Sequence, residues 1–323
     1  MPALAELARR RFKRDARIEW LFRSLTRGCA VLVLAVLLGV VVALVHGSLP
    51  ALEAFHWSFL TTEVWNPVTD KYGALAPVYG TVVTSLIAMV IAIPISFGVA
   101  IFLTENCPVF LRRPIGTAIE LLAAIPSIVF GIWGLFVLAP LLQQHVQPWL
   151  IEHIGPWPLV GALFQGPPFG IGLLTAGLVL AIMVLPFVSS VMREVFSMTP
   201  RSLKEGAYGL GATQWEVVRG IVLPWSRVGV IGGIMLGLGR ALGETMAVTF
   251  VIGNAHRISG SLLAPGTTIS ATIANEFTES VGDLYTSSLI ALGLVLFVLT
   301  ISIIAAARLL IMRLEAGSGR SRP

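Results

Sequence analysis

The chain has 323 residues, of which 56% are hydrophobic and only 12% are charged, whereas a soluble protein carries about 25% charged residues. This composition excludes an ordinary soluble globular protein. The formal net charge of +5 does not indicate nucleic-acid binding, because the basic residues are distributed along the chain and form no single patch.

Six apolar stretches are long enough to cross a bilayer, which takes about 20 predominantly apolar residues in a helix. They are expected at residues 28–45, 78–103, 117–142, 172–192, 228–253 and 285–311. Three of them contain a proline (Pro94, Pro126 or Pro186), which predicts kinks in these helices. The predicted fold class is therefore an all-α membrane protein with six transmembrane helices.

The predicted spans divide the chain into five parts. We expect a basic cytoplasmic tail (1–27), a first transmembrane anchor helix (28–46), an outward loop (47–77), a core of five transmembrane helices (78–312) that contains the polar loop 193–227, and a cytoplasmic C-terminal tail (313–323). In the outward loop, Trp57 and Trp65 are expected to be anchors at the membrane interface.

The distribution of lysine and arginine predicts the orientation of these spans. Both termini, the loop 104–116 and the loop 193–227 together hold 19 of the 22 basic residues, whereas the intervening loops hold only Lys71 and Arg257. Because basic residues concentrate on the cytoplasmic side, both termini and the loop 193–227 are expected in the cytoplasm. The basic N-terminal tail also suits contact with anionic membrane lipid.

The segment 199–224 is a polar stretch between two very apolar ones. Its capping and terminating residues predict two short helices joined by a turn at the membrane surface. Thr199 and Pro200 are expected at the start of the first helix, and Gly209 and Gly211 at its end. The capping-box pair Thr213 and Glu216 is expected at the start of the second helix.

The same segment resembles the signature of ABC importer permeases, which is Glu-Ala-Ala, three residues, Gly, nine residues, and Ile-x-Leu-Pro. The matching positions are Glu205, Gly206 (in place of the usual Ala), Ala207, Gly211, Ile221, Leu223 and Pro224. This resemblance implies that the loop is the coupling helix that docks into an ATPase subunit. The alternative interpretation is an ordinary amphipathic loop helix.

The fifth stretch carries a charged pair. Arg240 lies about 12 residues into the expected span, or ~18 Å along a helix, where an unpaired charge costs at least ~2.5–3.5 kcal/mol. Glu244 follows one helical turn later, so an ion pair is expected. Gly229, Gly233 and Gly237 lie on the same helical face and predict close packing against another helix. Two interpretations stay open for the pair, namely a structural brace and a substrate or gating site.

Residues 239–254, together with 64–67 and 79–85, resemble the PstC-like permease family of bacterial phosphate ABC importers, and the similarity extends over about 55–312. The resemblance implies the type I ABC importer permease fold in the bacterial inner membrane, and it implies that Arg240 and Glu244 take part in phosphate transport. The implied partners are a homologous second permease, two ATPase subunits and a periplasmic phosphate-binding protein.

Phosphate fits this chemistry, because a guanidinium pairs bidentately with an oxyanion, and Glu244 can accept the proton that phosphate, unlike sulfate, still carries. The sequence contains no glycine-rich loop of the kind that binds the phosphates of ATP, no metal-ligand spacing and no catalytic constellation. No enzyme, cofactor or metal is therefore expected. The alternatives are an ABC permease for another oxyanion or small solute and, in a different class, a proton-coupled carrier that uses Arg240 and Glu244.

Overall fold

The computed structural model describes residues 2–158 and 160–317. In these residues the structure is helical, and its only strand-like feature is an isolated antiparallel bridge between Asn66 and Lys71. Six helices are long and apolar enough to cross a membrane, spanning Ile18–Phe55, Leu75–Asn106, Ser127–His153, Leu173–Ser197, Gln214–Gly243 and Asp283–Leu309. The predicted all-α membrane protein with six spans is therefore confirmed.

The helices follow one another along the chain, with longer connections between α2 and α3 and between α12 and α13. The longer ones are α1 (Pro2–Phe55), α3 (Leu75–Ile101), α4 (Val109–Ala123), α8 (Leu173–Ser197), α11 (Leu223–Gly243) and α14 (Asp283–Gly317). The shorter ones are α2 (Ser58–Thr61), α5 (Ser127–Trp133), α6 (Ala139–Leu141), α7 (Gln147–His153), α9 (Arg201–Gly209), α10 (Gln214–Val217), α12 (Met246–Thr249) and α13 (Ile269–Glu276). Between them lie the π-helical turns η1 (Phe102–Asn106), η2 (Gly134–Leu138), η3 (Leu142–Val146) and η5 (Val218–Val222), and the 3₁₀ turn η4 (Gly161–Phe164).

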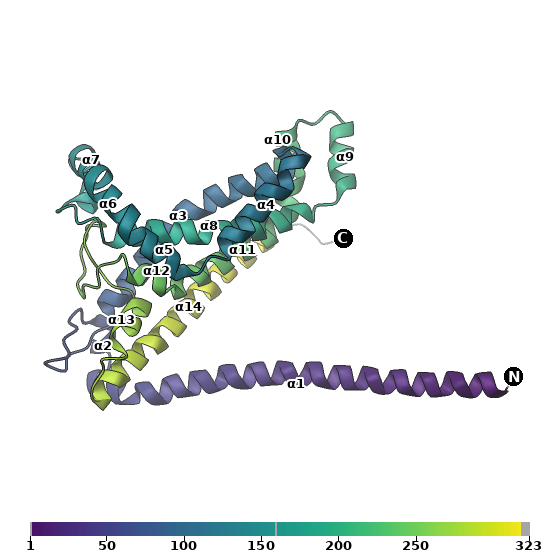
Figure 1. Cartoon of the computed structure of the whole chain (residues 1–323), viewed down its shortest axis with the longest axis horizontal. Coiled ribbons are helices and arrows are strands. Elements are labelled where there is room, and N and C mark those ends of the chain that lie inside the picture. Colours follow the sequence, from purple (N-terminus) through teal and green to yellow (C-terminus); the bar gives the residue numbers. More distant parts are fainter. Residues whose placement is uncertain (1, 159, 318–323) are drawn as a thin grey trace.

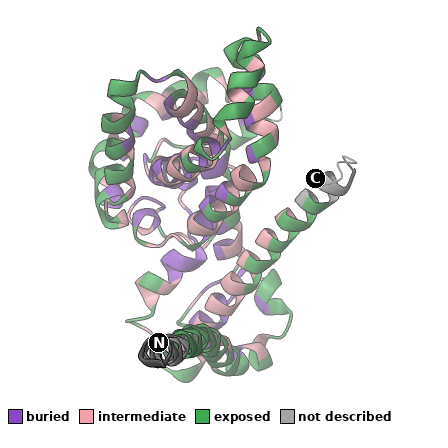
Figure 2. Ribbon diagram, turned by 90° about the vertical axis from the view of Figure 1, so that its right-hand side faces the viewer, coloured by how far each residue is buried: buried purple, intermediate pink, exposed green. Residues whose placement is uncertain are grey.

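Helix α8 forms the centre of the bundle and packs against α3, α11 and α4 (Figure 1). Most of its buried side chains are apolar, and the most enclosed ones, such as Val184 and Val188, have no exposed surface. Figure 2 shows that buried residues concentrate among these central helices. A core built around one central helix holds the neighbouring elements in fixed positions around it.

Helix α1 lies at the edge of this bundle and contacts it mainly through α14 (Figure 1). Near its C-terminal end the N–H of Ala51 donates to the hydroxyl of Ser287 at 3.0 Å, whereas residues 18–40 are exposed. The helix runs without a break from Pro2 to Phe55, so no change of secondary structure separates the expected tail (1–27) from the first span.

The third span lies further along the chain than the expected 117–142. Helix α4 ends at Ala123, and α5 begins after Pro126, which has extended backbone angles (φ −57°, ψ 138°). A proline disfavours helical conformation in the residue before it, so the chain breaks here and the span runs from Ser127 to His153. Pro94 and Pro186, in contrast, lie inside α3 and α8.

Candidate functional site

The polar loop 193–227 lies at one end of the bundle, where α9 projects beyond the spans and α10 begins the fifth span (Figure 1). Helix α9 ends at Gly209, and Gly211 then adopts a positive φ of 85°, which a residue without a side chain reaches easily. Thr213 and Glu216 form both hydrogen bonds of the predicted capping box. The prediction of two short helices with a glycine turn is therefore confirmed.

The start of α9 differs from the expectation. Pro200 is the N-cap residue, and the side chain of Thr199 does not cap the helix. Instead Thr199 is 3% exposed, and its hydroxyl has no hydrogen-bond partner. The predicted capping role of Thr199 is wrong, because its buried hydroxyl accepts no N–H of α9.

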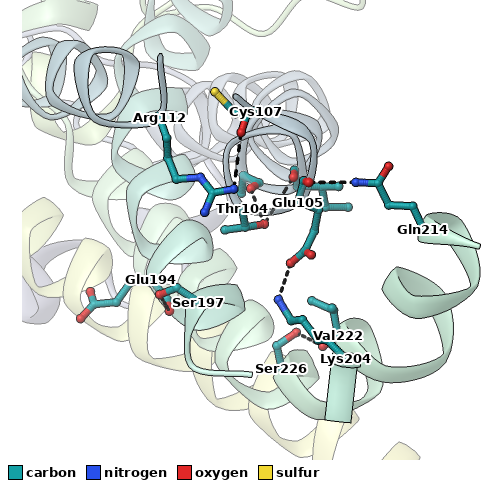
Figure 3. A network of polar contacts seen from close by, with 12 residues as sticks. Thr104, Glu105, Cys107, Arg112, Glu194, Ser197, Lys204, Gln214, Val222 and Ser226 are labelled. Carbon is teal, nitrogen blue, oxygen red and sulfur yellow. Dashed lines mark hydrogen bonds and ion pairs between the residues drawn. The ribbon is translucent and has the colours of Figure 1, made fainter. Parts of the chain in front are cut away.

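One acidic residue ties the loop to the spans. The ammonium of Lys204 in α9 lies 2.5 Å from the carboxylate of Glu105 in η1, and the amide of Gln214 in α10 donates to the backbone oxygen of Glu105 at 2.8 Å (Figure 3). The side chain of Glu105 is only 7% exposed. Both helices of the loop are thus attached to the end of the second span.

The residues of the predicted signature do not share one face. Glu205, Gly206 and Gly211 are exposed, whereas Ala207 and Leu223 pack against the core of the bundle. Ile221 in η5 and Pro224 at the start of α11 are half-buried. The exposed members are accessible to a partner, and the packed members fix the loop on the bundle.

Apolar residues that the sequence analysis did not single out are exposed on the same loop. They include Leu203 (44% exposed), Tyr208 (44%), Leu210 (92%) and Trp215 (63%). Large apolar groups exposed beside polar ones are typical of a surface that binds another protein. Their occurrence within a polar segment is the sequence signal that would have pointed to them.

Arg240 and Glu244 do not form the predicted ion pair. Helix α11 ends at Gly243, and Glu244 has extended backbone angles (φ −68°, ψ 131°). Its carboxylate accepts the N–H of Ala247 at 3.3 Å and so lies at the start of α12. The prediction of a continuous helix over 228–253 is wrong. Because the helix ends before Glu244, the two side chains are not held one helical turn apart.

Arg240 is enclosed among helices without a carboxylate partner in the part of the chain that the structure describes. Its guanidinium lies 5.3 Å from the centre of the Phe187 ring, and its Nε atom is buried without a hydrogen-bond partner. Phe187 is the 15th of the 25 residues of α8, so Arg240 is level with the middle of a span. A guanidinium with free donors at this depth is available to an anion.

The predicted close packing of the glycine stripe is confirmed. A Cβ atom on Gly229 would lie 2.5 Å from Val195, and one on Gly237 would lie 2.5 Å from Val188. Both valines belong to α8, so the face of α11 that carries Arg240 is pressed against the central helix.

A second polar cluster, which the sequence analysis missed, lies near the start of α14, away from the loop 193–227. The carboxylate of Glu276 accepts hydrogen bonds from Trp65 (2.6 Å) and Tyr285 (2.7 Å), and it contacts the His256 ring at 2.7 Å. Trp65 and His256 stack with ring centres 5.4 Å apart. The cluster joins the loop before α3, the loop after α12 and the ends of α13 and α14.

Burial of Glu276 would by itself raise the pKa of its carboxyl, but the hydrogen bonds from His256, Tyr285 and Trp65 outweigh it and lower the pKa. Trp65 is 8% exposed, so its predicted role as an interfacial anchor is wrong, whereas Trp57 is 81% exposed. Trp65 is buried because its indole N–H has an acceptor inside the protein.

Six spans, a helix interrupted beside an intramembrane charge and a structured loop beyond the spans define a multi-pass membrane protein. Residues 92–316 match the family described as "Binding-protein-dependent transport system inner membrane component", and the chain belongs to this family. The family predicted from the signature at residues 205–224 is therefore confirmed.

Curated relatives match nearly the whole chain. It is 61% identical to the phosphate transport system permease protein PstC of Mesorhizobium japonicum, over 99% of this chain and 98% of that protein. It is 58% identical to the PstC protein of Pasteurella multocida, over 94% of each. A chain of the inward-facing MetNI methionine ABC transporter aligns with 73% of this chain and 94% of its own length, with 17% identity and a TM-score of 0.46.

Proposed function

We propose that this chain is the transmembrane permease subunit of an ATP-driven importer of inorganic phosphate. The observation that carries the proposal is the 61% identity over nearly the full length to a protein named as a phosphate transport permease. Arg240 supports it further, because an unpaired guanidinium level with the middle of a span suits a transported anion.

The proposed assembly contains this chain, a homologous second permease, two ATPase subunits and a periplasmic phosphate-binding protein. It lies in the bacterial inner membrane with both termini in the cytoplasm, in keeping with the distribution of basic residues. ATP hydrolysis belongs to the ATPase subunits, and this chain supplies the pathway and the mechanical coupling.

Coupling in this proposal begins at α9. Glu205 and the exposed apolar residues around it, such as Leu210, dock on an ATPase subunit. Movement of α9 then reaches the second span through the Lys204–Glu105 ion pair and reaches α11 through η5. Because η5 contacts α9 and leads directly into α11, which carries Arg240, the docked surface is linked to the anion pathway.

Arg240 and Glu244 have separate roles in the proposed pathway. Arg240 donates to the phosphate oxygens, and Glu244, on the non-helical stretch between α11 and α12, accepts the proton that phosphate carries. Helix breaks inside a membrane protein are tolerated where they are buried in protein or line a cavity, which is the setting expected for a substrate site.

The test is uptake of labelled phosphate by phosphate-starved cells that lack this chain and other phosphate importers, with and without the restored gene. We expect high-affinity uptake that depends on this chain, that arsenate inhibits and that sulfate does not. Uptake of another oxyanion in place of phosphate would support the first alternative. Uptake that persists without an ATPase subunit would support the proton-coupled carrier.

A further inference from the structure

A basic pocket lies beneath α9, between η1, α4 and the end of α8. Its volume is about 400 Å³. The charged groups that line it are Arg112, Arg113, Glu120, Arg193, Arg201 and Lys204. Figure 3 shows Arg112, Thr104, Ser197 and Lys204 of this lining, which come from four different elements.

The positive charge of this pocket is only partly compensated. Lys204 pairs with Glu105, and Arg193 pairs with Glu120. Among the residues that the structure describes, Arg112, Arg113 and Arg201 have no carboxylate within salt-bridge distance. Three guanidinium groups around one pocket repel one another, and a bound anion would relieve this repulsion.

Thr199 provides a second, independent indication of a ligand. It is 3% exposed, it lines the pocket, and its hydroxyl has no hydrogen-bond partner. A buried hydroxyl normally has a partner, so an acceptor atom is expected opposite it. The nine-residue helix α9 begins at Arg201, and the first N–H groups of a helix also favour an anion.

We propose that this pocket binds a phosphate-bearing anion, with Arg112, Arg201 and Thr199 as donors to its oxygens. Guanidinium groups match the geometry of phosphate oxygens and hold them bidentately. The bound anion joins α4 to α9, so it steadies the loop that the proposed ATPase subunit would contact. The binding itself does not depend on the proposed transport of phosphate.

Two sources can supply this chemistry. One is the headgroup of an anionic lipid, since α4 begins with the exposed apolar residues Val109 (83%) and Phe110 (76%), which suit an adjacent membrane surface. The other is free inorganic phosphate. The experiment therefore has one arm for each source.

The first arm measures binding of labelled inorganic phosphate to the full-length chain in detergent by equilibrium dialysis. All variants carry Arg240→Gln, so that binding in the membrane pathway does not contribute. We expect Arg112→Gln/Arg201→Gln to weaken binding about tenfold or more, because charge-assisted hydrogen bonds are lost. Arg219→Gln/Arg227→Gln, which removes the same number of positive charges from the loop 193–227 outside the pocket, is the matched control.

The second arm measures lipid retention. The chain is purified from membranes that contain phosphatidylglycerol, and retained lipid is counted by native mass spectrometry. A headgroup site predicts that Arg112→Gln/Arg201→Gln retains less phosphatidylglycerol than the control. Thr199→Val removes only the hydroxyl, and we expect it to weaken binding in the arm in which Arg112→Gln/Arg201→Gln shows a loss. Circular dichroism verifies that each variant is folded.

A loss confined to the first arm identifies free phosphate as the ligand, and a loss confined to the second identifies a lipid headgroup. Either loss supports the site. Equal phosphate binding and equal lipid retention in the pocket variants and the control would overturn it. Equal losses in the pocket variants and the control would overturn it as well, because they would reflect general surface charge.

Discussion

Lys204 and Glu105 form an ion pair at 2.5 Å that joins α9 to the π-helical end of the second span. Their side chains are 17% and 7% exposed, so the pair is largely shielded from solvent. Gln214 donates to the backbone oxygen of the same glutamate at 2.8 Å. A displacement of α9 therefore has a direct route into α3.

Replacing Lys204 with methionine tests this attachment. The change leaves the carboxylate of Glu105 enclosed without its partner, which for a fully buried pair costs about 3–5 kcal/mol. The cost here is expected to be smaller, because the side chain of Lys204 retains 17% exposure. We expect a lower Tm of the solubilised chain and slower phosphate uptake by the intact importer.

The control for this prediction is the double variant Glu105→Gln/Lys204→Met, which removes both charges. It should recover much of the lost Tm, because no unpaired charge remains, but it should not restore full uptake. Identical Tm values for Lys204→Met and the unchanged protein would show that the ion pair does not hold α9.

The glycine stripe of α11 offers a prediction with a closely matched control. A Cβ on Gly237 would lie 2.5 Å from Val188, a stiff side chain with no exposed surface, whereas a Cβ on Gly232 would have no atom within 4 Å. Overpacking costs about 1–3 kcal/mol, and replacing a helical glycine by alanine contributes about 1 kcal/mol of stability. We expect Gly237→Ala to lower the Tm and Gly232→Ala to leave it unchanged or raise it.

Thermal unfolding of the two alanine variants, purified in the same detergent, checks this prediction. The two glycines lie on the same helix, so their helix propensities are comparable and the contact with α8 is the principal difference. Equal Tm values would mean that α8 and α11 can separate enough to admit a methyl group.

Local sequence signals predicted the features that depend on neighbouring residues. The capping box at Thr213 and Glu216 and the glycine stripe require only the spacing of residues within one helix. The number of spans follows from hydropathy. These features could be predicted because tertiary contacts reinforce, and do not override, the local preference.

The break after Gly243 could not be predicted in this way. The residues that follow it, 246–252, are apolar apart from Thr249, so the apolar stretch continues beyond the break. The structure turns the chain there because α12 packs against α5, where Gly131 leaves room for Ala247 and Phe250. The error over Trp65 has the same origin, since its partner Glu276 is 211 residues away.

The Glu276 cluster predicts a dependence of stability on pH. The pKa of Glu276 is lowered in the folded protein from its ordinary value of 4.5, so the folded state favours the charged form. The contribution of ionised Glu276 to the free energy of unfolding is therefore fully present above pH 4.5. It is lost as the pH falls through the lowered pKa that Glu276 has in the folded protein. We expect the Tm of the unchanged protein to fall in this acidic range.

Replacing Glu276 with glutamine isolates this contribution. The variant keeps an acceptor for Trp65 or Tyr285 but cannot ionise, so its Tm at neutral pH should be lower and should depend less on pH below 4.5. Glu279→Gln, an exposed change three residues along, is the control. Parallel pH profiles for Glu276→Gln and the unchanged protein would contradict the lowered pKa.

The final prediction concerns Arg240 in the proposed pathway. Replacing it with glutamine removes the charge that an anion would meet beside Phe187, and we expect uptake to fall about tenfold or more, since charge-assisted hydrogen bonds are lost. Arg308→Gln, an exposed change on α14, is the matched control and should leave uptake unchanged. Full uptake by Arg240→Gln would contradict this prediction and would support the alternative interpretation of Arg240 as a structural brace.

Glu244→Gln separates selectivity from folding. The glutamine oxygen can still accept the N–H of Ala247, so the start of α12 should be preserved and the Tm should change little. The neutral amide is a weaker acceptor for the proton of phosphate than a carboxylate is, so we expect the preference for phosphate over sulfate to decrease. Competition of sulfate with labelled phosphate uptake measures this preference. An unchanged preference together with an unchanged uptake rate would place selectivity outside this chain, in the proposed binding protein.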